Sequence, residues 1–197
     1  MATNPKDVPR HYYSLDEYFA LEKASDARFE YWDGEIVCMS GGTRAHYRIS
    51  SNVHASLAVA LRGGRCQAFT GDAPVWTPTL PPYRYPDASA ACGELQYKNV
   101  SGLDALVNPT VVVEVTSPST VVLDEGPKFV AYQAIPTLRE YLLVSQDAPR
   151  VTHYTRRGDG SVWERRDVTD TDATLELESI GCALKMRDIY DGVAFPA

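Results

Sequence analysis

The sequence predicts an α/β domain built around a mixed β-sheet. Residues 110–116 and 139–145 carry strongly apolar runs, which are typical of central strands covered on both faces. Apolar residues at helical spacing between positions 46 and 61 predict an amphipathic helix. The dipeptide Asp33-Gly34 and the turn at 156–161 separate strand-like runs in the manner of antiparallel hairpins. Central-type strands, hairpins and helices in one chain favour a sheet of mixed strand direction.

The N-terminal third predicts a helix, a hairpin and a second helix. Ser14 and Glu17 form a capping-box pattern, which begins a short amphipathic helix. The first hairpin follows, and Glu30 lies in its first strand. The next apolar stripe is headed by His46 and stops at Gly63-Gly64, a typical helix end.

The rest of the chain alternates between strands and loops. Short β-forming runs between residues 66 and 92 predict strands, and the fading pattern over 93–108 predicts a surface loop. After the strand at 110–116, Asp124 is expected to cap a helix that has Pro127 in its first turn and Pro136 at its stop. A final hairpin and a short closing segment complete the predicted domain.

Composition limits the class of protein. A chain of 197 residues with 44% hydrophobic and 23% charged residues can form one globular domain, so we expect a single domain over 1–197. Its first dozen residues lack the apolar core of a secretory signal, and no apolar run approaches the ~20 residues of a membrane span, so a cytoplasmic protein without a membrane partner is expected.

The cysteines and the net charge argue against further classes of protein, namely zinc or redox proteins and indiscriminate nucleic-acid binders. The four cysteines are dispersed without zinc-site or redox spacing, and we expect reduced structural thiols at Cys38, Cys66, Cys92 and Cys182. A formal net charge of −7 argues against indiscriminate binding to nucleic acid. A polyanionic partner would need metal ions or a local basic patch to offset the repulsion.

The candidate chemistry lies at two acids and a lysine. Glu114 stands inside the apolar run, although an unpaired ionised carboxylate is costly in a protein core. Asp87 lies on a second predicted strand, and neighbouring strands can bring two carboxylates to one sheet edge, where they would suit Mg²⁺. Lys128 follows just inside the next helix. Together these residues are typical of a metal-assisted hydrolysis site.

Several segments resemble the PD-(D/E)XK nuclease superfamily, in its bacterial branch of small, mostly uncharacterised restriction-endonuclease-like proteins. The matching pieces are "YPDAS", "VVVEVTSPST", "DEGPKFVAYQ" and "FEYWDGE". The resemblance implies a restriction-endonuclease-like mixed sheet flanked by helices, with Asp87 and Glu114 as ligands of Mg²⁺ or Mn²⁺ and Lys128 as the catalytic lysine. It also implies Glu30 and His46 near the same site, DNA as the nucleic-acid substrate, and a homodimer.

The sequence departs from the orthodox superfamily pattern in two places. The orthodox lysine would stand at Thr116, so Lys128 would be a lysine that has migrated to the next helix. The segment between Asp87 and Glu114 is also longer than in many members, and its loop could reshape access of the substrate.

Each candidate acid or lysine has a structural alternative. Asp87 could be a turn residue after Pro86. Glu114 could form a structural ion pair with Arg139. Lys128 could be a solvated helix lysine held by Asp124 in an ordinary surface pair.

The second-tier candidates also have alternatives. His46 could be a satisfied core histidine near a helix start, and Glu30 a solvent-facing strand residue. The basic pairs Arg156-Arg157 and Arg165-Arg166 could form a solvated hairpin or could touch phosphate.

Three functional classes fit these residues. The first is a metal-dependent endonuclease that hydrolyses nucleic-acid phosphodiester bonds. The second is a catalytically inactive nucleic-acid or protein-binding module on the same fold, which the acidic net charge favours and the complete Asp-Glu-Lys set opposes. The third is a small-molecule metallohydrolase that uses the same carboxylates. A DNA-binding assay with and without divalent metal discriminates between the first two.

Overall fold

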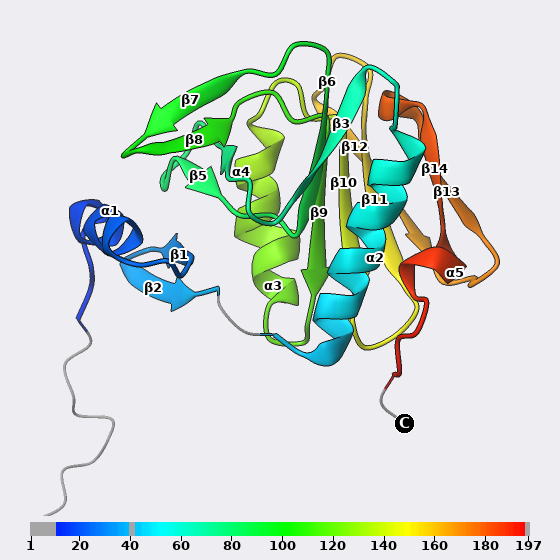
Figure 1. Ribbon diagram of the computed structural model, residues 1–197, viewed down its shortest axis with the longest axis horizontal. Helices are drawn as coiled ribbons and strands as arrows, with labels where there is room; N and C mark the ends of the chain where they lie inside the picture. The colour runs from blue at the N-terminus through cyan, green and yellow to red at the C-terminus, as the bar shows by residue number, and fades with distance from the viewer. Residues whose placement is uncertain (1–10, 40–41, 196–197) are drawn as a thin grey trace, which may run out of the picture. The chain divides into compact units, whose positions relative to one another are not determined.

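A computed structural model describes residues 11–39 and 42–195, and its chain forms two compact units, 1–41 and 42–197 (Figure 1). The N-terminal unit contains helix α1 (Leu15–Ala24) and the hairpin of strands β1 (Phe29–Trp32) and β2 (Glu35–Cys38). The predicted capping box is confirmed, since Ser14 Oγ accepts the Glu17 N–H and the Glu17 carboxylate accepts the Ser14 N–H. The hairpin turns at Asp33 and Gly34, which both have positive φ, as a tight turn of this type requires.

A six-stranded mixed sheet forms the centre of the larger unit. Its strands in spatial order are β12 (Val162–Val168), β11 (Val151–Arg157), β10 (Glu140–Ser145), β9 (Val111–Thr116), β6 (Ala88–Cys92) and β3 (Cys66–Thr70). Strands β9 and β10 are parallel, and the other neighbours in this sheet are antiparallel. The predicted mixed α/β fold is therefore confirmed, and β9 and β10 are both buried along their whole length.

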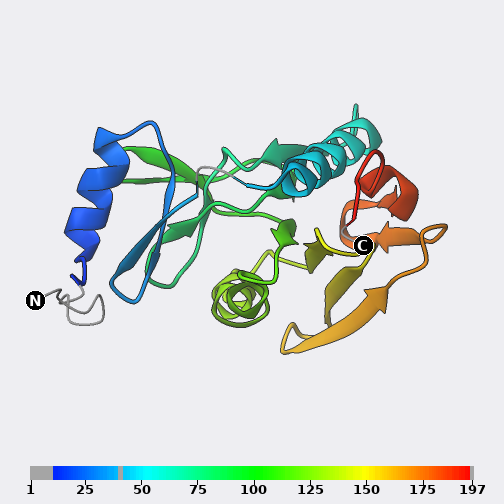
Figure 2. The ribbon, with the colours of Figure 1, turned by 90° about the horizontal axis from the view of Figure 1, so that it is seen from below.

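Helices cover both faces of this sheet (Figure 2). Helix α2 (Arg44–Ala60) packs on one face, where its apolar stripe joins the odd-numbered valines of β9 in the larger core. The other face carries helix α4 (Phe129–Gln133), which packs with Val112, Tyr141 and Tyr154 in a second, aromatic-rich core. Alternation along β9 therefore directs Val111, Val113 and Val115 to α2, and it directs Glu114 to the α4 side.

The structure replaces the predicted surface loop at 93–108 with a hairpin. Strands β7 (Tyr97–Val100) and β8 (Leu103–Leu106) pair antiparallel, and they belong to a second sheet with β4 (Val75–Trp76) and β5 (Tyr83–Arg84). The hairpin turns at Ser101-Gly102, where both residues have positive φ. Its exposed outer strand is polar, so the hydrophobic pattern that indicates a strand is weak there.

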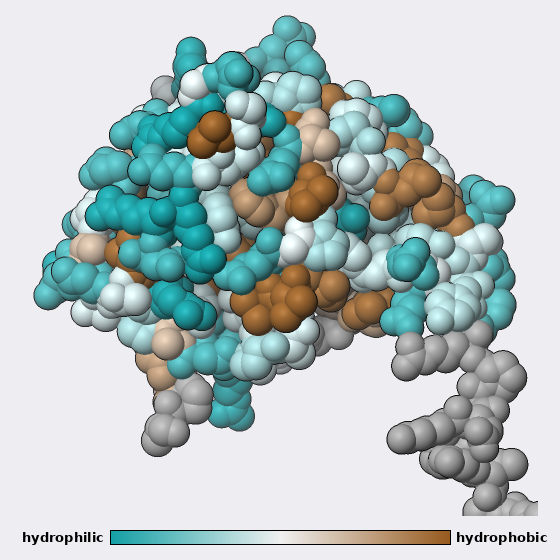
Figure 3. Space-filling view, turned by 180° about the vertical axis from the view of Figure 1, so that it is seen from behind, coloured by the Kyte–Doolittle hydropathy of each residue, from teal (hydrophilic) through white to brown (hydrophobic). Residues whose placement is uncertain are grey.

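The closing segment forms strands β13 (Thr174–Leu177) and β14 (Cys182–Lys185) and helix α5 (Met186–Ile189). These elements contribute side chains to the core beneath α2. No helix among the residues that the structure describes is long and apolar enough to span a membrane. The face in Figure 3 mixes hydrophilic side chains with separate apolar patches, as expected of an ordinary protein surface.

The helix after β9 begins earlier than predicted. It runs from α3 (Val121–Leu123) through a π-helical turn (Asp124–Lys128) into α4. Asp124 is therefore an interior residue, and its expected role as the helix cap is wrong. Pro127 was expected in the first turn of this helix, but it lies inside the π-helical turn. The wider π turn tolerates its missing N–H.

The expectation of four reduced thiols is wrong for two of them. Cys66 and Cys92 form a disulfide that links β3 to β6. They lie 26 residues apart in sequence, and only the antiparallel register of the two strands brings them opposite each other. Cys38 and Cys182 are free.

Candidate active site

The buried carboxylate of Glu114 has a cation and a hydroxyl beside it. The side chain of Lys128 places its Nζ 3.4 Å from Oε2 of Glu114, and the hydroxyl of Tyr132 donates to Oε1 at 2.9 Å. The Glu114 side chain is only 3% exposed, so it needs such compensation to remain ionised. Lys128 and Tyr132 both project from the helix that covers this face of the sheet, which explains how an acid is tolerated in an apolar strand.

Lys128 is buried between two acids. Besides its contact with Glu114, its Nζ lies 3.1 Å from Oδ1 of Asp124, one turn earlier in the helix. The Lys128 and Asp124 side chains are 6% and 2% exposed, so the alternative of an ordinary surface pair is wrong. One ammonium thus faces two carboxylates in a site largely shielded from water, where charge interactions are strong.

Asp87 lies at the same end of the sheet as Glu114. Strand β6 pairs Ala88 with Val113, so one further step in the antiparallel register brings Asp87 level with Glu114. The residue itself occupies a bend just before β6, and its Oδ2 accepts the backbone N–H of Val115 at 2.7 Å. This contact ties the Asp87 carboxylate to the C-terminal end of β9.

Helix α2 contributes two further groups to Asp87. Ser50 Oγ donates to Oδ1 at 3.2 Å, and His46 Nε2 lies 3.2 Å from the same oxygen. Burial alone would lower the pKa of His46, but the hydrogen bond and the charge of Asp87 outweigh it and raise that pKa. The structure therefore brings His46 to Asp87, whereas the alternative had it satisfied within the core.

Glu30 belongs to the N-terminal unit. Its Oε2 accepts a hydrogen bond from Trp32 Nε1 at 3.0 Å, and its strand pairs Glu30 with Val37. Its role in the site stays a prediction.

The arginines of the final hairpin are largely committed to structural contacts. Arg156 donates to the backbone carbonyls of Gln133, Ile135 and Leu138, at and just after the end of α4. Arg157 pairs with Glu164 and Glu178, while Arg165 lies near Glu125 and Asp167. Of the two alternatives for this cluster, the structure favours a structural and solvated hairpin over a phosphate contact.

Sequence reasoning missed the contacts of Tyr132 and Ser50, and it missed that Asp124 is buried. Asp124 was expected as a helix cap and as the surface partner of Lys128. Asp124, Lys128 and Tyr132 recur every four positions. This spacing puts side chains on one helix face and could have indicated a shared environment. Ser50 lies one turn after His46 on α2, so this spacing also puts two side chains of the site on one helix face.

A cavity of about 540 Å³ lies at the carboxyl ends of β9 and β10. Thr116 and Val121 line it from the β9 side, and Ser145 and residues 147–150 line it from the end of β10 and the β10–β11 turn. Arg150 is exposed there and is the cavity's cationic side chain. Crevices at the carboxyl ends of parallel strands are common ligand sites in α/β proteins.

Asp87 and Glu114 supply the oxygen donors that a divalent cation would need. Among residues 11–39 and 42–195, no group of three or more His, Cys, Asp or Glu side chains is disposed to hold a metal ion. Mg²⁺ needs fewer, because it usually keeps several waters and binds one or two carboxylates together with substrate phosphate. The chemistry of Asp87 and Glu114 fits that requirement, since both are oxygen donors at one end of the sheet.

The fold matches that of a solved nuclease-like protein. A crystal structure described as a putative nuclease belonging to DUF820, from Anabaena variabilis ATCC 29413, superposes with a TM-score of 0.71. The match covers 92% of this chain and 99% of that one, at 17% sequence identity, so the two share a fold.

Sequence comparisons give the family. Residues 15–187 match the family model Uma2, described as "Putative restriction endonuclease", and the chain belongs to this family. An uncharacterised protein of Synechocystis sp. (strain PCC 6803) is 33% identical over 99% of this chain and 100% of its own length. A second uncharacterised protein of that strain is 31% identical over 82% of this chain and 90% of its own length. The predicted relationship to small restriction-endonuclease-like proteins is confirmed at this level.

Proposed function

We propose that the chain is a metal-dependent endonuclease of the PD-(D/E)XK type, which hydrolyses phosphodiester bonds in DNA. The proposal rests on the arrangement of side chains at one end of the paired strands β6 and β9. There, Asp87 and Glu114 come level, while the buried Lys128 stands against Glu114. Two carboxylates and an ammonium at one sheet edge meet the needs of metal-assisted hydrolysis. The restriction-endonuclease family assignment agrees with this chemistry.

Each side chain has a proposed role. Asp87 and Glu114 would hold Mg²⁺ or Mn²⁺, which would polarise the phosphate and favour ionisation of a bound water. Lys128 would orient the attacking water and stabilise the charge that develops on the phosphate. Attack by water forms one phosphorus–oxygen bond and breaks another, which leaves one phosphorylated and one hydroxyl end. His46 and Ser50 would hold Asp87 in position through their contacts with its Oδ1.

The neighbouring cavity supports a nucleic-acid substrate. Thr116 lines this cavity, and it lies two residues after Glu114 on the same face of β9. A strand advances ~3.3 Å per residue, so the cavity begins within ~7 Å of the proposed metal ligand along the strand. Arg150 could there contact a phosphate next to the scissile one. Such a local cation is required because the whole chain is acidic.

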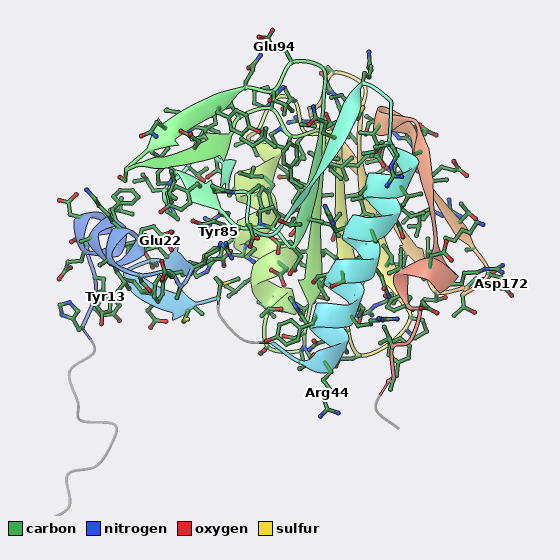
Figure 4. All side chains as sticks on the ribbon, viewed as in Figure 1. Tyr13, Glu22, Arg44, Tyr85, Glu94 and Asp172 are labelled. Carbon is green, nitrogen blue, oxygen red and sulfur yellow. A yellow bond between two sulfur atoms is a disulfide. The ribbon has the colours of Figure 1, made fainter. Side chains whose placement is uncertain are left out.

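The test is cleavage of labelled single- and double-stranded DNA with Mg²⁺, with Mn²⁺ and with a chelator. Cleavage should require metal and should be lost in Asp87→Asn and Glu114→Gln. Asp172→Asn and Glu94→Gln are the matched controls, since both residues are exposed and lie far from the end of β9 (Figure 4). Equal cleavage by the site variants and their controls would contradict the proposal. Metal-independent DNA binding without cleavage would favour the inactive binding module.

A further inference from the structure

Two buried carboxylates contact the same buried lysine. Asp124, Glu114 and Lys128 are 1%, 3% and 5% exposed, and the ammonium of Lys128 contacts both carboxylates. Oδ1 of Asp124 is buried and makes no hydrogen bond among the described residues, and its compensation is the ion pair with Lys128 at 3.1 Å. Buried charges of this kind are retained only where partners compensate them.

The backbone around Asp124 is also fixed. The hydroxyl of Tyr141 on β10 donates to the carbonyl oxygen of Asp124 at 2.9 Å. Asp124 begins the π-helical turn that ends at Lys128, and such turns recur at functional sites. The acid is therefore held from the central sheet, and it reaches the lysine from within the same turn.

We infer that Asp124 is a positioning residue that anchors Lys128 beside Glu114 and so leaves Glu114 available to a metal ion. This inference rests on the proposed function. The lysine contacts both acids, at 3.1 Å to Asp124 and 3.4 Å to Glu114. When Glu114 binds a cation, Lys128 keeps the Asp124 contact and stays in the site. Without the Asp124 charge, Lys128 shifts towards Glu114 and competes with the metal for that carboxylate.

A double-mutant cycle on Mg²⁺ affinity tests the anchor without any activity measurement. By titration calorimetry, Asp124→Asn should weaken Mg²⁺ binding ~10-fold or more, as loss of a group that supports a metal ligand commonly does. The same substitution in a Lys128→Met background should change the affinity less than ~2-fold, because the competing ammonium is then absent. Asp172→Asn is the control, and thermal melting checks the fold of each variant.

Other results of the cycle overturn the inference. An equal loss of affinity in both backgrounds would mean that Asp124 acts on the metal directly, as a ligand or as a charge. An unchanged affinity in Asp124→Asn would mean that the residue has only a structural role.

Amine labelling gives a second readout that needs no metal. Reductive methylation followed by mass spectrometry should modify Lys128 slowly in the wild type and faster in Asp124→Asn, while the exposed Lys98 and Lys185 react equally in both. Unchanged Lys128 labelling would overturn the anchor. If the wild type binds no Mg²⁺ or Mn²⁺, the proposed function fails, and labelling alone then decides whether Asp124 anchors the lysine.

Discussion

Asp87 and Val115 are joined by a hydrogen bond of 2.7 Å, in which the backbone N–H of Val115 donates to Oδ2 of the aspartate. This bond crosses from the start of β6 to the end of β9, next to Glu114. It sets the position of the Asp87 carboxylate without using Oδ1, which faces Ser50 and His46. The geometry therefore ties Asp87 to the end of β9, next to Glu114.

Removing the charge of Asp87 should reduce cleavage but leave the stability of the fold almost unchanged. We expect Asp87→Asn to reduce Mg²⁺-dependent cleavage more than ~100-fold, a larger loss than supporting groups around metal ligands usually produce. The amide can still accept the Val115 N–H, so the melting temperature should change little. Cleavage rates and thermal melting of the variant and of Asp172→Asn check this. Cleavage at the wild-type rate would remove Asp87 from the site.

Lys128 should matter for stability as well as for cleavage. Lys128→Met leaves Asp124 and Glu114 without the ammonium that both contact, so we expect the free energy of unfolding to fall by ~3–5 kcal/mol. Adding Asp124→Asn should recover part of that loss, because it removes one of the two acids. Urea denaturation of the single and double variants measures both effects. A single variant as stable as the wild type would indicate that the three charges are not coupled.

Arg150 should affect how binding depends on salt. If it contacts one phosphate, Arg150→Ala should lower the slope of log affinity against log salt by ~1 and weaken DNA binding at low salt. Arg62→Ala is the matched control, since Arg62 is exposed just beyond the C-terminal end of α2. Equal slopes for both variants would exclude a phosphate contact at Arg150.

The cysteines should differ in reactivity. Burial raises the pKa of the Cys182 thiol to about 11, with the charge of Glu140 adding to the effect, so little thiolate forms at pH 8. Because the thiolate is the nucleophile, iodoacetamide should modify the exposed Cys38 well before Cys182. Raising the pH towards 11 should narrow this difference. Without reductant, Cys66 and Cys92 should stay unmodified, which peptide mass spectrometry can measure.

Much of the fold could be predicted because its strongest patterns are local. The apolar runs of β9 and β10, the stripe of α2 and the Asp33-Gly34 turn each contain enough information to define an element. The polar β7–β8 hairpin could not be predicted, since its strands are defined by pairing within a sheet rather than by alternation. The Cys66–Cys92 disulfide was missed for the same reason, because only the strand register brings the two residues together.

The sequence indicated candidate residues for the site but not their environment. The positions of Asp87, Glu114 and Lys128 follow from the family resemblance, and strand alternation gives the face of Glu114. The burial of Asp124 and Lys128 does not follow, because the helix was expected to begin at Asp124. An earlier helix start turns that acid inward, and the surface pair of the sequence becomes a buried charge cluster.

The contacts of Arg156 have a consequence for biosynthesis. This side chain, from β11, donates to carbonyls at and just after the end of α4, the helix that continues from Lys128. During synthesis, the end of that helix therefore gains these hydrogen bonds only after β11 has left the ribosome. A nascent chain stalled before residue 156 would contain both proposed ligands and the lysine, yet it would lack the arginine that binds the end of the lysine's helix.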